Sequence, residues 1–503
     1  MSELGFWRLA TTAPDAIAVV EPDGTRVTRG ELLARANATS RVLRGLGLER
    51  GDRVVGVVAN ESWAIALVLA CQQIGAYYVP VNTALTTTEV GYIIEDAAPV
   101  AVFCSLAHAG TVRAADRRFT FGSAQGFRDL TAEIADVPTG PVEDRAPGSY
   151  LGYTSGTTGR PKGVLRKLPE GDPDDVFAAG AAWQLGMFGI TPLDDGVHLV
   201  TSPLSHTAVS GLAVTSLHYG HAVVLMDRFD AETVLRLIQE HRVTTTHMVP
   251  TQLHRLLRLP PEVRGAYDVS SMRNLVHGAG PCPESVKRAM IEWFGPVVWE
   301  YYGATEAAGT AITSAEWLAR PGSVGRPQPG AEVRVLDPDG EQVPAGTSGR
   351  VFLRMGAHAF SYRGDDAKTR ATRVGDFVTV GDLGHLDEDG YLYLLGRTAE
   401  VIVSGGVNIY PAEVEAALLE HPDVQDAGVV GLPDPEWGEI ACAVIQVVPG
   451  ATDVADRLAP FLADRLARFK VPRRYQVVAE LPRGANGKLR KHLLPALVRE
   501  GTP

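Results

Sequence analysis

Short apolar runs alternate with amphipathic stretches along most of this chain. Runs such as Val54-Val55-Gly56-Val57-Val58 and Val223-Val224-Leu225-Met226 are typical of strands that are buried on both faces. Stretches such as 231–241 instead carry apolar residues at helical spacing. Repeated β/α units of this kind predict an α/β fold.

A strand, a turn and a helix follow one another between residues 274 and 295. The strand Asn274-Leu275-Val276 leads into the turn His277-Gly278-Ala279-Gly280. The helix then begins near Pro283 and ends before Gly295, and a proline at the start with a glycine just past the end is typical of helix boundaries. Because α/β sheets bind ligands at the carboxyl ends of their strands, this turn is a candidate ligand site.

The pattern restarts as a compact unit after Gly396-Arg397. Before it, residues 325–354 predict short antiparallel strands around the turn Asp337-Pro338-Asp339-Gly340. After it, we expect a strand at 401–403, a helix at 411–420, strands near 429–430 and 444–447, and a helix that ends at Arg468. The expected domains are therefore residues 1–398 and 399–503.

Size, charge and cysteine content exclude several classes of protein. A chain of 503 residues that is 45% hydrophobic can bury a large core and must divide into more than one domain. Its net charge of −12, without a long basic cluster, argues against nucleic acid as a partner. The four cysteines are scattered, which indicates neither a zinc site nor a disulfide framework. No signal sequence or membrane span is evident, so we expect a cytoplasmic protein with no stable membrane insertion.

The segment from Tyr153 to Val164 concentrates hydroxyl groups, glycines and one lysine in a single loop. Glycines let backbone N–H groups approach oxyanions closely, and hydroxyls and an ammonium group supply further donors, so phosphate is the expected ligand. The loop is not a Walker A motif, because its lysine follows Pro161 and precedes Gly163, and a plain polar linker is the alternative. The candidate phosphate contacts are Thr154, Ser155, Gly156, Thr157, Thr158, Gly159 and Lys162.

Together with three further motifs, this loop resembles the adenylate-forming superfamily, which contains acyl- and aryl-CoA synthetases, carrier-protein-loading adenylation domains and beetle luciferases. The further motifs are Gly51-Asp52-Arg53-Val54, Tyr78-Val79-Pro80-Val81-Asn82 and Asn486-Gly487-Lys488, so the resemblance extends over nearly the whole chain. It implies a large N-terminal domain of stacked β-sheets with helices and a small mobile C-terminal α/β domain. It also implies ATP, Mg²⁺ and coenzyme A as ligands.

The resemblance assigns much of the ATP site to two segments. In Glu300-Tyr301-Tyr302-Gly303-Ala304-Thr305-Glu306, Glu306 would hold Mg²⁺, Thr305 would bond the α-phosphate and Tyr302 would stack on adenine. Magnesium suits one carboxylate plus phosphate oxygens. Taken alone, the tyrosines could also be strand-end aromatics and Glu306 a solvated acid. The expected nucleotide contacts here are Gly278, Ala279, Gly280, Tyr301, Tyr302, Gly303 and Ala304.

Three further polar residues complete the expected ATP site. Asp382 matches the position from which the family's aspartate accepts hydrogen bonds from both ribose hydroxyls, and Arg397 would reach the same ribose or the phosphate. A turn aspartate and an exposed arginine are the alternatives. Lys488 resembles the family's catalytic lysine, whose ammonium would bridge the attacking carboxylate and the α-phosphate. Such cations are needed because two like unit charges ~4 Å apart repel by about 4 kcal/mol at an effective dielectric constant near ~20.

The acid substrate is expected to contact His206, His277, Gly303 and Ala304. His206 falls where the family places a residue that gates the acyl pocket, and a core histidine is the alternative. It is not expected to act as a general base, because a carboxylate nucleophile is already ionised at neutral pH. Small residues near the expected tunnel, including Ala307, Ala308 and Gly309, favour a hydrophobic acid that is long or bulky.

The resemblance places the CoA tunnel and the hinge in the C-terminal domain. Glycine at 405 and 406 would allow close backbone approach to pantetheine, and a tryptophan in the core of the small domain is the main alternative for Trp437. At Ala399 the family normally has a hinge aspartate or lysine, so either alanine bends adequately or adenylation is slow. The expected CoA contacts are Ser404, Gly405, Gly406, Trp437, Phe469, Lys470 and Arg473.

We therefore predict an ATP- and Mg²⁺-dependent acyl-CoA synthetase, an acid–thiol ligase that forms an acyl-adenylate and then the CoA thioester. The alternatives are a carrier-protein-loading enzyme, a luciferase-like oxygenase, a non-catalytic adenylate-binding regulator, and a variant that takes acyl-adenylate from a partner enzyme because of Ala399. A homodimer also remains open. The identity of the acid cannot be predicted, since the walls of the pocket come from dispersed positions.

Overall fold

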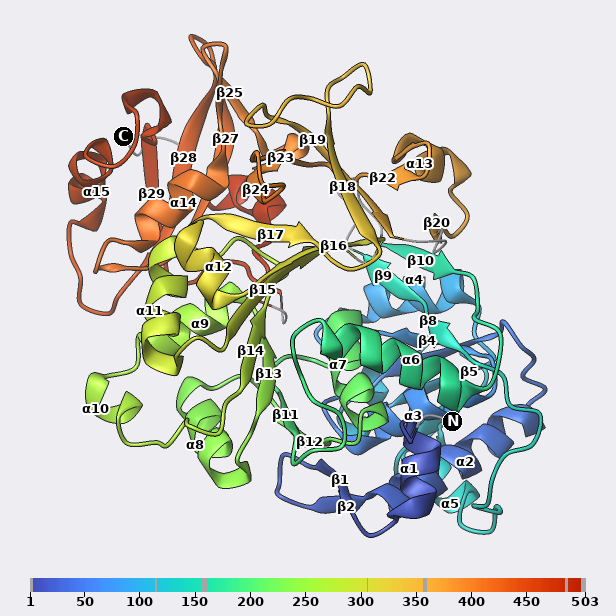
Figure 1. The fold of residues 1–503 in the computed structure, drawn as a ribbon. Coiled ribbons are helices and arrows are strands. Elements are labelled where there is room, and N and C mark those ends of the chain that lie inside the picture. Colours follow the sequence, from blue (N-terminus) through green and yellow to red (C-terminus); the bar gives the residue numbers. More distant parts are fainter. Residues whose placement is uncertain are drawn as a thin grey trace. The chain divides into compact units, whose positions relative to one another are not determined.

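The computed structural model of this chain divides into two compact units (Figure 1). The structure describes residues 3–113, 115–154, 161–304, 306–355, 360–484 and 487–498. Unit 1 comprises residues 1–248, 258–276 and 357–371, and unit 2 comprises residues 249–257, 277–356 and 372–503. Within the described ranges, no helix has both the length and the apolar character needed to cross a membrane.

Unit 1 contains a six-stranded parallel sheet with helices on both faces. The strand order is β7-β6-β5-β3-β4-β8, and the predicted strand at 54–58 is confirmed as β3 (Arg53–Val57). Alternate residues of β3 enter different cores: Val54 packs with α2 (Arg29–Gly45) and α3 (Ser62–Gln73), whereas Val55 packs with α4 (Thr87–Ala97). The other strands are β4 (Tyr77–Pro80), β5 (Ala101–Cys104), β6 (Arg118–Thr120), β7 (Arg128–Asp129) and β8 (Ser149–Tyr150).

A second layer of unit 1 repeats the β/α pattern. Strands β12 (Ala222–Leu225) and β13 (Thr245–Met248) lie on either side of β11 (Val197–Val200), and both pair with it in parallel. The connecting helix α8 (Ala231–His241) has the bounds that the sequence predicted. The remaining elements of this layer are β2 (Arg26–Thr28), β1 (Ile17–Val20), α1 (Phe6–Thr12), α6 (Pro173–Gly186), α7 (Thr207–His218), α10 (Pro261–Arg264) and β14 (Asn274–His277), whereas α5 (Leu130–Glu133) packs with β6 and β7 of the first sheet.

A small antiparallel sheet of unit 1 joins two strands that are close in sequence to a third that is distant. It has the order β20-β10-β9, with β9 (Gly152–Thr154), β10 (Lys162–Arg166) and β20 (Phe360–Tyr362). Lys162 lies opposite Thr154 in the β9–β10 pair, and α13 (Asp366–Ala371) follows β20. The strand expected before the phosphate loop is therefore present, and it brings Lys162 next to the start of α13.

The first part of unit 2 is an antiparallel sheet. Its order is β15-β16-β17-β24-β23-β19-β22-β21, with β18 paired to β19, so short antiparallel strands are confirmed over 325–354. The predicted turn is present as well, since the Glu341 N–H donates to Asp337 Oδ1 at 2.9 Å. Bounds are β15 (Val298–Gly303), β16 (Ala308–Ile312), β17 (Ser323–Pro327), β18 (Ala331–Leu336), β19 (Gly349–Met355), β21 (Arg373–Val374), β22 (Phe377–Val378), β23 (Asp382–Leu386) and β24 (Leu392–Arg397).

Three helices of unit 2 precede or flank this sheet: α9 (Pro250–Leu257), α11 (Glu284–Phe294) and α12 (Ser314–Ala319). The helix predicted from Pro283 is α11, with Pro283 as its N-cap residue and Gly295 after its last turn. The φ of Gly295 is +83°, in the left-handed region that glycine adopts without a steric penalty. The sequence signals at both ends of this helix were therefore correct.

The C-terminal segment of unit 2 forms a five-stranded sheet with its own core. Helices α14 (Pro411–Leu419) and α15 (Val454–Ala463) pack their apolar residues, including Val414 and Leu458, against this sheet (Figure 1). Its strands are β25 (Ile402–Ser404), β26 (Val407–Ile409), β27 (Val424–Asp434), β28 (Gly438–Val447) and β29 (Arg474–Val478). The boundary near residue 399 remains a prediction.

One prediction for this segment is wrong, because the last helix ends at Ala463 and not at Arg468. Ala467 has an extended backbone, and residues Arg468–Lys470 form a single 3₁₀ turn. Asp464 is the C-cap residue, so the helix stops five residues before the predicted end, although Leu466 and Phe469 continue its apolar spacing.

A buried ion pair in unit 2 joins helix α11 to strand β15. Lys287 Nζ of α11 is 2.6 Å from Glu300 Oε2, and the two residues are 0% and 5% exposed. Burial lowers the pKa of Lys287 and raises the pKa of Glu300, and the opposite charge of each partner counteracts these shifts. The Lys287 ammonium also lies 5.0 Å from the ring centre of Trp317. Glu300 directly precedes the two tyrosines of the expected nucleotide site.

We expect Lys287→Met to lower the free energy of unfolding by about 3–5 kcal/mol, because it leaves the Glu300 carboxylate buried without its counter-charge. Replacing both partners, as in Lys287→Met with Glu300→Leu, should restore most of that loss. Urea denaturation followed by circular dichroism measures both values. A single variant as stable as the wild type would show that this pair is not needed for stability.

Candidate active site

Three of the expected nucleotide contacts meet in unit 2. The Tyr302 hydroxyl donates to Asp382 Oδ2 at 2.7 Å, and Arg397 Nε donates to Asp382 Oδ1 at 3.1 Å. Asp382 and Arg397 are direct cross-strand partners on β23 and β24, so the sheet register brings them together. A carboxylate has about four lone-pair sites, and Asp382 therefore retains acceptor capacity for ribose hydroxyls.

The Tyr302 hydroxyl remains a donor at all ordinary pH values. Burial, together with the neighbouring Asp382 carboxylate, holds the pKa of Tyr302 well above its usual value. A protonated tyrosine orients the carboxylate without adding a second negative charge beside it. The contact thus fixes Asp382 in a form that accepts hydrogen bonds.

Each tyrosine of β15 lies very close to a glycine: Tyr301 to Gly278 and Tyr302 to Gly309. A Cβ added at Gly278 would lie 2.7 Å from the Tyr301 ring and 2.8 Å from the Tyr301 carbonyl oxygen. A Cβ at Gly309 would lie 2.7 Å from the carbonyl oxygen of Tyr302. Any side chain at either position would force the tyrosine backbone to move, so the placement of both tyrosines depends on these glycines. Gly309 was expected only as a small residue near the acid, and its i, i+7 distance from Tyr302 gave no signal of this contact.

The turn that carries Gly278 is conformationally unusual. Ala279 has a φ of +66°, in the left-handed region that residues with a Cβ rarely adopt. Backbone in this region costs about 1–3 kcal/mol, and such residues cluster at functional sites. The strained turn lies at the carboxyl end of β14, where the sequence predicted a ligand site.

Lys488 and Glu306 are in electrostatic range of each other and of the same cluster. Burial lowers the pKa of Lys488, the Arg397 charge lowers it further, and the carboxylates of Glu400, Asp382 and Glu306 oppose these effects. Glu306 is 8% exposed. The described ranges contain no group of three His, Cys, Asp or Glu residues able to hold a metal ion. A single carboxylate at Glu306 suits Mg²⁺ that takes its other ligands from phosphates and water.

In unit 1, Lys162 forms an ion pair with Asp365. Asp365 directly precedes α13, and its Oδ1 accepts a hydrogen bond from the Lys368 N–H at 2.9 Å. The backbone of Arg363 also donates to the Gly163 carbonyl at 2.9 Å. Sequence reasoning missed this carboxylate, because Asp365 lies 203 residues from Lys162. Of the other phosphate contacts, Ser155, Gly156, Thr157, Thr158, Gly159 and Thr305 lie outside the described residues.

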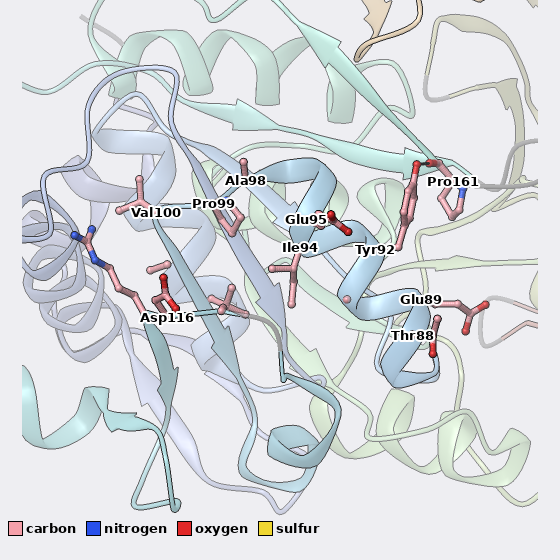
Figure 2. Close-up of a pocket in the computed structure, with 15 residues that line it drawn as sticks. Thr88, Glu89, Tyr92, Ile94, Glu95, Ala98, Pro99, Val100, Asp116 and Pro161 are labelled. Carbon is pink, nitrogen blue, oxygen red and sulfur yellow. Dashed lines mark hydrogen bonds between the residues drawn. The ribbon is translucent and has the colours of Figure 1, made fainter.

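A cavity of about 1000 Å³ lies beside α4 in unit 1 (Figure 2). Tyr92 and Pro161 stand at one end of it, and the Tyr92 hydroxyl donates to the Pro161 carbonyl at 3.1 Å. Asp96, one turn further along α4, accepts a hydrogen bond from the Tyr153 hydroxyl. These contacts tie α4 to both ends of the expected phosphate loop. Among the described residues, the lining of this cavity includes none of those expected to contact the acid.

The residues expected to contact the acid are divided between the units. In unit 1, burial lowers the pKa of His206 to about 4, so this side chain is neutral and a poor base at neutral pH. In unit 2, His277 is fully buried, with Nε2 3.8 Å from Glu300 Oε2. Gly303 ends β15, and the N–H of the next residue, Ala304, donates to the Ala307 carbonyl at 2.8 Å.

Of the expected CoA contacts, Gly405, Trp437 and Arg473 lie together beside the β25–β26 hairpin, whereas Phe469 and Lys470 lie in the 3₁₀ turn Arg468–Lys470. Gly405 lies against Trp437, since a Cβ there would be 2.7 Å from the indole ring, and the Arg473 guanidinium stacks 4.1 Å from the ring centre. Ser404 and Gly406 flank this contact at the β25–β26 hairpin, and Phe469 is 48% exposed. Lys470 Nζ is paired with both carboxylate oxygens of Glu413, at 2.6 and 2.8 Å, which the sequence did not indicate.

The expected hinge residue, Ala399, is exposed in a 3₁₀ turn (Thr398–Glu400). Both neighbours are anchored. The Thr398 N–H donates to the Gly381 carbonyl at 2.8 Å, and Glu400 Oε2 is 2.9 Å from Lys491 Nζ. Lys491 also contacts Glu415 at 2.9 Å.

The chain is similar to known proteins over nearly its whole length. The model of the AMP-binding enzyme family matches residues 6–362, and that of the AMP-binding enzyme C-terminal domain matches residues 413–488. Feruloyl-CoA synthase from Amycolatopsis sp. is 34% identical over 496 residues, 97% of each chain. The amide bond synthetase McbA from Marinactinospora thermotolerans is 30% identical, with 98% and 99% coverage and a TM-score of 0.83. The o-succinylbenzoate CoA synthetase from Bacillus subtilis, in complex with an acyl-adenylate intermediate, is 28% identical, with 98% coverage of each chain and a TM-score of 0.81. These likenesses confirm the predicted α/β fold.

We expect Asp382→Ala to weaken ATP binding by about 10- to 100-fold, because hydrogen bonds to a charged group contribute about 1.5–3 kcal/mol. Tyr302→Phe keeps the ring and the carboxylate and should weaken binding by less than about 10-fold. Isothermal titration calorimetry with ATP and Mg²⁺ measures both. Equal affinity in wild type and Asp382→Ala would remove Asp382 from the nucleotide site.

Proposed function

This chain belongs to the AMP-binding enzyme family and is an AMP-forming acid–thiol ligase, and we propose that it joins a hydrophobic carboxylic acid to the thiol of coenzyme A. ATP, Mg²⁺ and CoA are the ligands of such ligases. The observation that carries the proposal is the group formed by Lys488, Glu306, Asp382 and Arg397 in unit 2. It combines the Lys488 ammonium with the acids that a nucleotide and its metal require.

The proposed reaction has two steps, each a substitution. A carboxylate oxygen of the acid attacks the α-phosphorus of ATP, a new P–O bond forms, and the bond to pyrophosphate breaks. Lys488 offsets the repulsion between the two anions, since opposite charges within ~4 Å contribute about 4 kcal/mol at an effective dielectric constant near ~20. In the second step the CoA thiolate attacks the acyl carbonyl carbon, and AMP leaves.

The proposed substrate class rests on the small residues around β15. Gly303 and Ala304 have little or no side chain and would leave room for a bulky acyl group, whereas Ala307, expected near the acid, packs in the core with Val351 and Leu353. Neutral His206 places no charge beside an apolar acid at neutral pH. The name of the feruloyl-CoA synthase relative supports an aryl acid as one member of this class.

CoA is proposed as the acceptor because Trp437, Arg473 and the β25–β26 hairpin form one exposed group. A carrier protein is the alternative thiol, and the likeness to an amide bond synthetase makes an amine a further acceptor to test. We place the reaction in the cytoplasm. A second copy of the chain and an enzyme that supplies acyl-adenylate are the protein partners to test.

A panel of carboxylic acids with ATP, Mg²⁺ and CoA tests the proposal directly. We expect AMP, pyrophosphate and a CoA thioester with ferulate, benzoate or a medium-chain fatty acid, and little product with acetate or an amino acid. Mass spectrometry of the thioester and a pyrophosphate assay report the two steps separately. Pyrophosphate release without any thioester would favour a different acceptor, and no release with any acid would contradict the ligase reaction.

We expect Lys488→Ala to slow pyrophosphate release by about 100-fold or more, because it removes a cation that acts on the developing charge. Thioester formation from supplied acyl-adenylate should change little. Since burial lowers the pKa of Lys488 from 10.5, the ammonium is lost as pH rises through a value below 10.5, and adenylation should decline there. An exposed lysine, Lys167, provides the control Lys167→Ala. Equal slowing of both steps in Lys488→Ala would contradict the assigned role.

A further inference from the structure

Residues 482–484 and 487–490, which include Lys488, are held together by backbone hydrogen bonds, and we call them the Pro482–Arg490 turn. The Arg490 N–H donates to the Pro482 carbonyl, and the Gly484 N–H donates to the Lys488 carbonyl, each at 2.8 Å. Arg483 and Leu489 are paired in an isolated antiparallel bridge. The backbone on both sides of Lys488 is therefore held close to Arg483.

Arg483 attaches this turn to β27 through a forked ion pair. Its Nε and Nη2 lie 2.5 Å from Asp426 Oδ2 and Oδ1, and its Nη1 donates to the Gly487 carbonyl at 2.7 Å. Both side chains are only 16% exposed. All three guanidinium nitrogens are thus used, and one of them bonds the residue that directly precedes Lys488. Two parallel bonds to a carboxylate fix direction as well as distance.

A second contact on β27 holds the other side of the turn. Gly428 lies two residues after Asp426, and a Cβ there would be 2.6 Å from Leu489 Cδ2. Residues i and i+2 of a strand face the same side of the sheet. One face of β27 therefore contacts both neighbours of Lys488. Asp426 binds Arg483, which bonds Gly487, and Gly428 packs against Leu489.

We propose that Arg483 and Asp426 are positioning residues for Lys488 in the adenylation step. The inference rests on the proposed function, in which the Lys488 ammonium acts on the α-phosphate. Lysine is a point charge on a flexible stem, so its effect depends on where its backbone is held. Misplacement of a catalytic group by ~1 Å can slow a reaction by about 100-fold.

The charge of Arg483 does not account for such an effect. Its guanidinium is neutralised by Asp426 in a paired geometry, so the pair contributes little net field at a distance. Arg483 therefore acts through the geometry of the turn. A substitution that keeps the charge but loses the fork should be defective, and that distinguishes positioning from electrostatic assistance.

The test compares Arg483→Met and Arg483→Lys with wild type in two half-reactions. The first is ATP–pyrophosphate exchange with the most active acid of the panel, and the second is thioester formation from synthetic acyl-adenylate and CoA. We expect Arg483→Met to lower the kcat of exchange by about 10- to 100-fold, with the KM for ATP changed by less than about 3-fold. Thioester formation should be unchanged in Arg483→Met. The kcat of exchange in Arg483→Lys should lie between the values of wild type and Arg483→Met.

A matched control removes another arginine–carboxylate pair of the same sheet domain. Arg465 Nε is 3.1 Å from Glu420 Oε2, and neither residue belongs to the Pro482–Arg490 turn, so Arg465→Met should exchange pyrophosphate as wild type does. Asp426→Asn keeps Arg483 and gives a milder variant if Arg483→Met does not fold, and the same selective loss is expected. Loss of both half-reactions to an equal degree, or of neither, would overturn the positioning role. Absence of exchange in the wild type would instead contradict the proposed function.

Discussion

Carboxylates hold several of the cations that are expected or proposed to act in catalysis or ligand binding in the two units. Asp382 binds Arg397, Asp365 binds Lys162, Glu413 binds Lys470, and Asp426 binds Arg483. In a protein with a net charge of −12, a site for anions has to concentrate positive charge without exposing it as a long basic surface. Pairing each cation with a specific acid meets that constraint. The position of each ammonium or guanidinium group is consequently set by a partner that is often distant in sequence.

The same constraint explains which parts of the site could be predicted. Motifs such as Glu300 to Glu306 and the Lys488 segment are local, so their spacing can be seen in one sequence. Alternating apolar runs predicted β3, α8 and α11 closely, because burial on a sheet or a helix face imposes a period on the residues themselves. The buried strand–turn–helix near Gly278 was found in the same way.

Apart from Asp382, the acids that hold the cations could not be predicted, because nothing local marks them. Asp365 resembles any helix-start aspartate, and Arg483 and Asp426 are 57 residues apart. The close approach of Gly309 to Tyr302 depends on the β15–β16 register, which contains an irregularity between Tyr302 and Gly303. The end of α15 was misplaced because the apolar period continued beyond the point at which the backbone leaves the helix.

The anchors around residue 399 limit where the chain can bend. Thr398 is bonded to Gly381 on one side, and Glu400 is paired with Lys491, which in turn contacts Glu415 of α14, on the other. A methyl side chain at Ala399 provides neither a charge nor a hydrogen bond that would resist rotation. If the C-terminal segment turns as a rigid body, its pivot is a single residue, Ala399, and Glu400 moves with the segment. The rotation would then be governed by the φ and ψ of Ala399 alone.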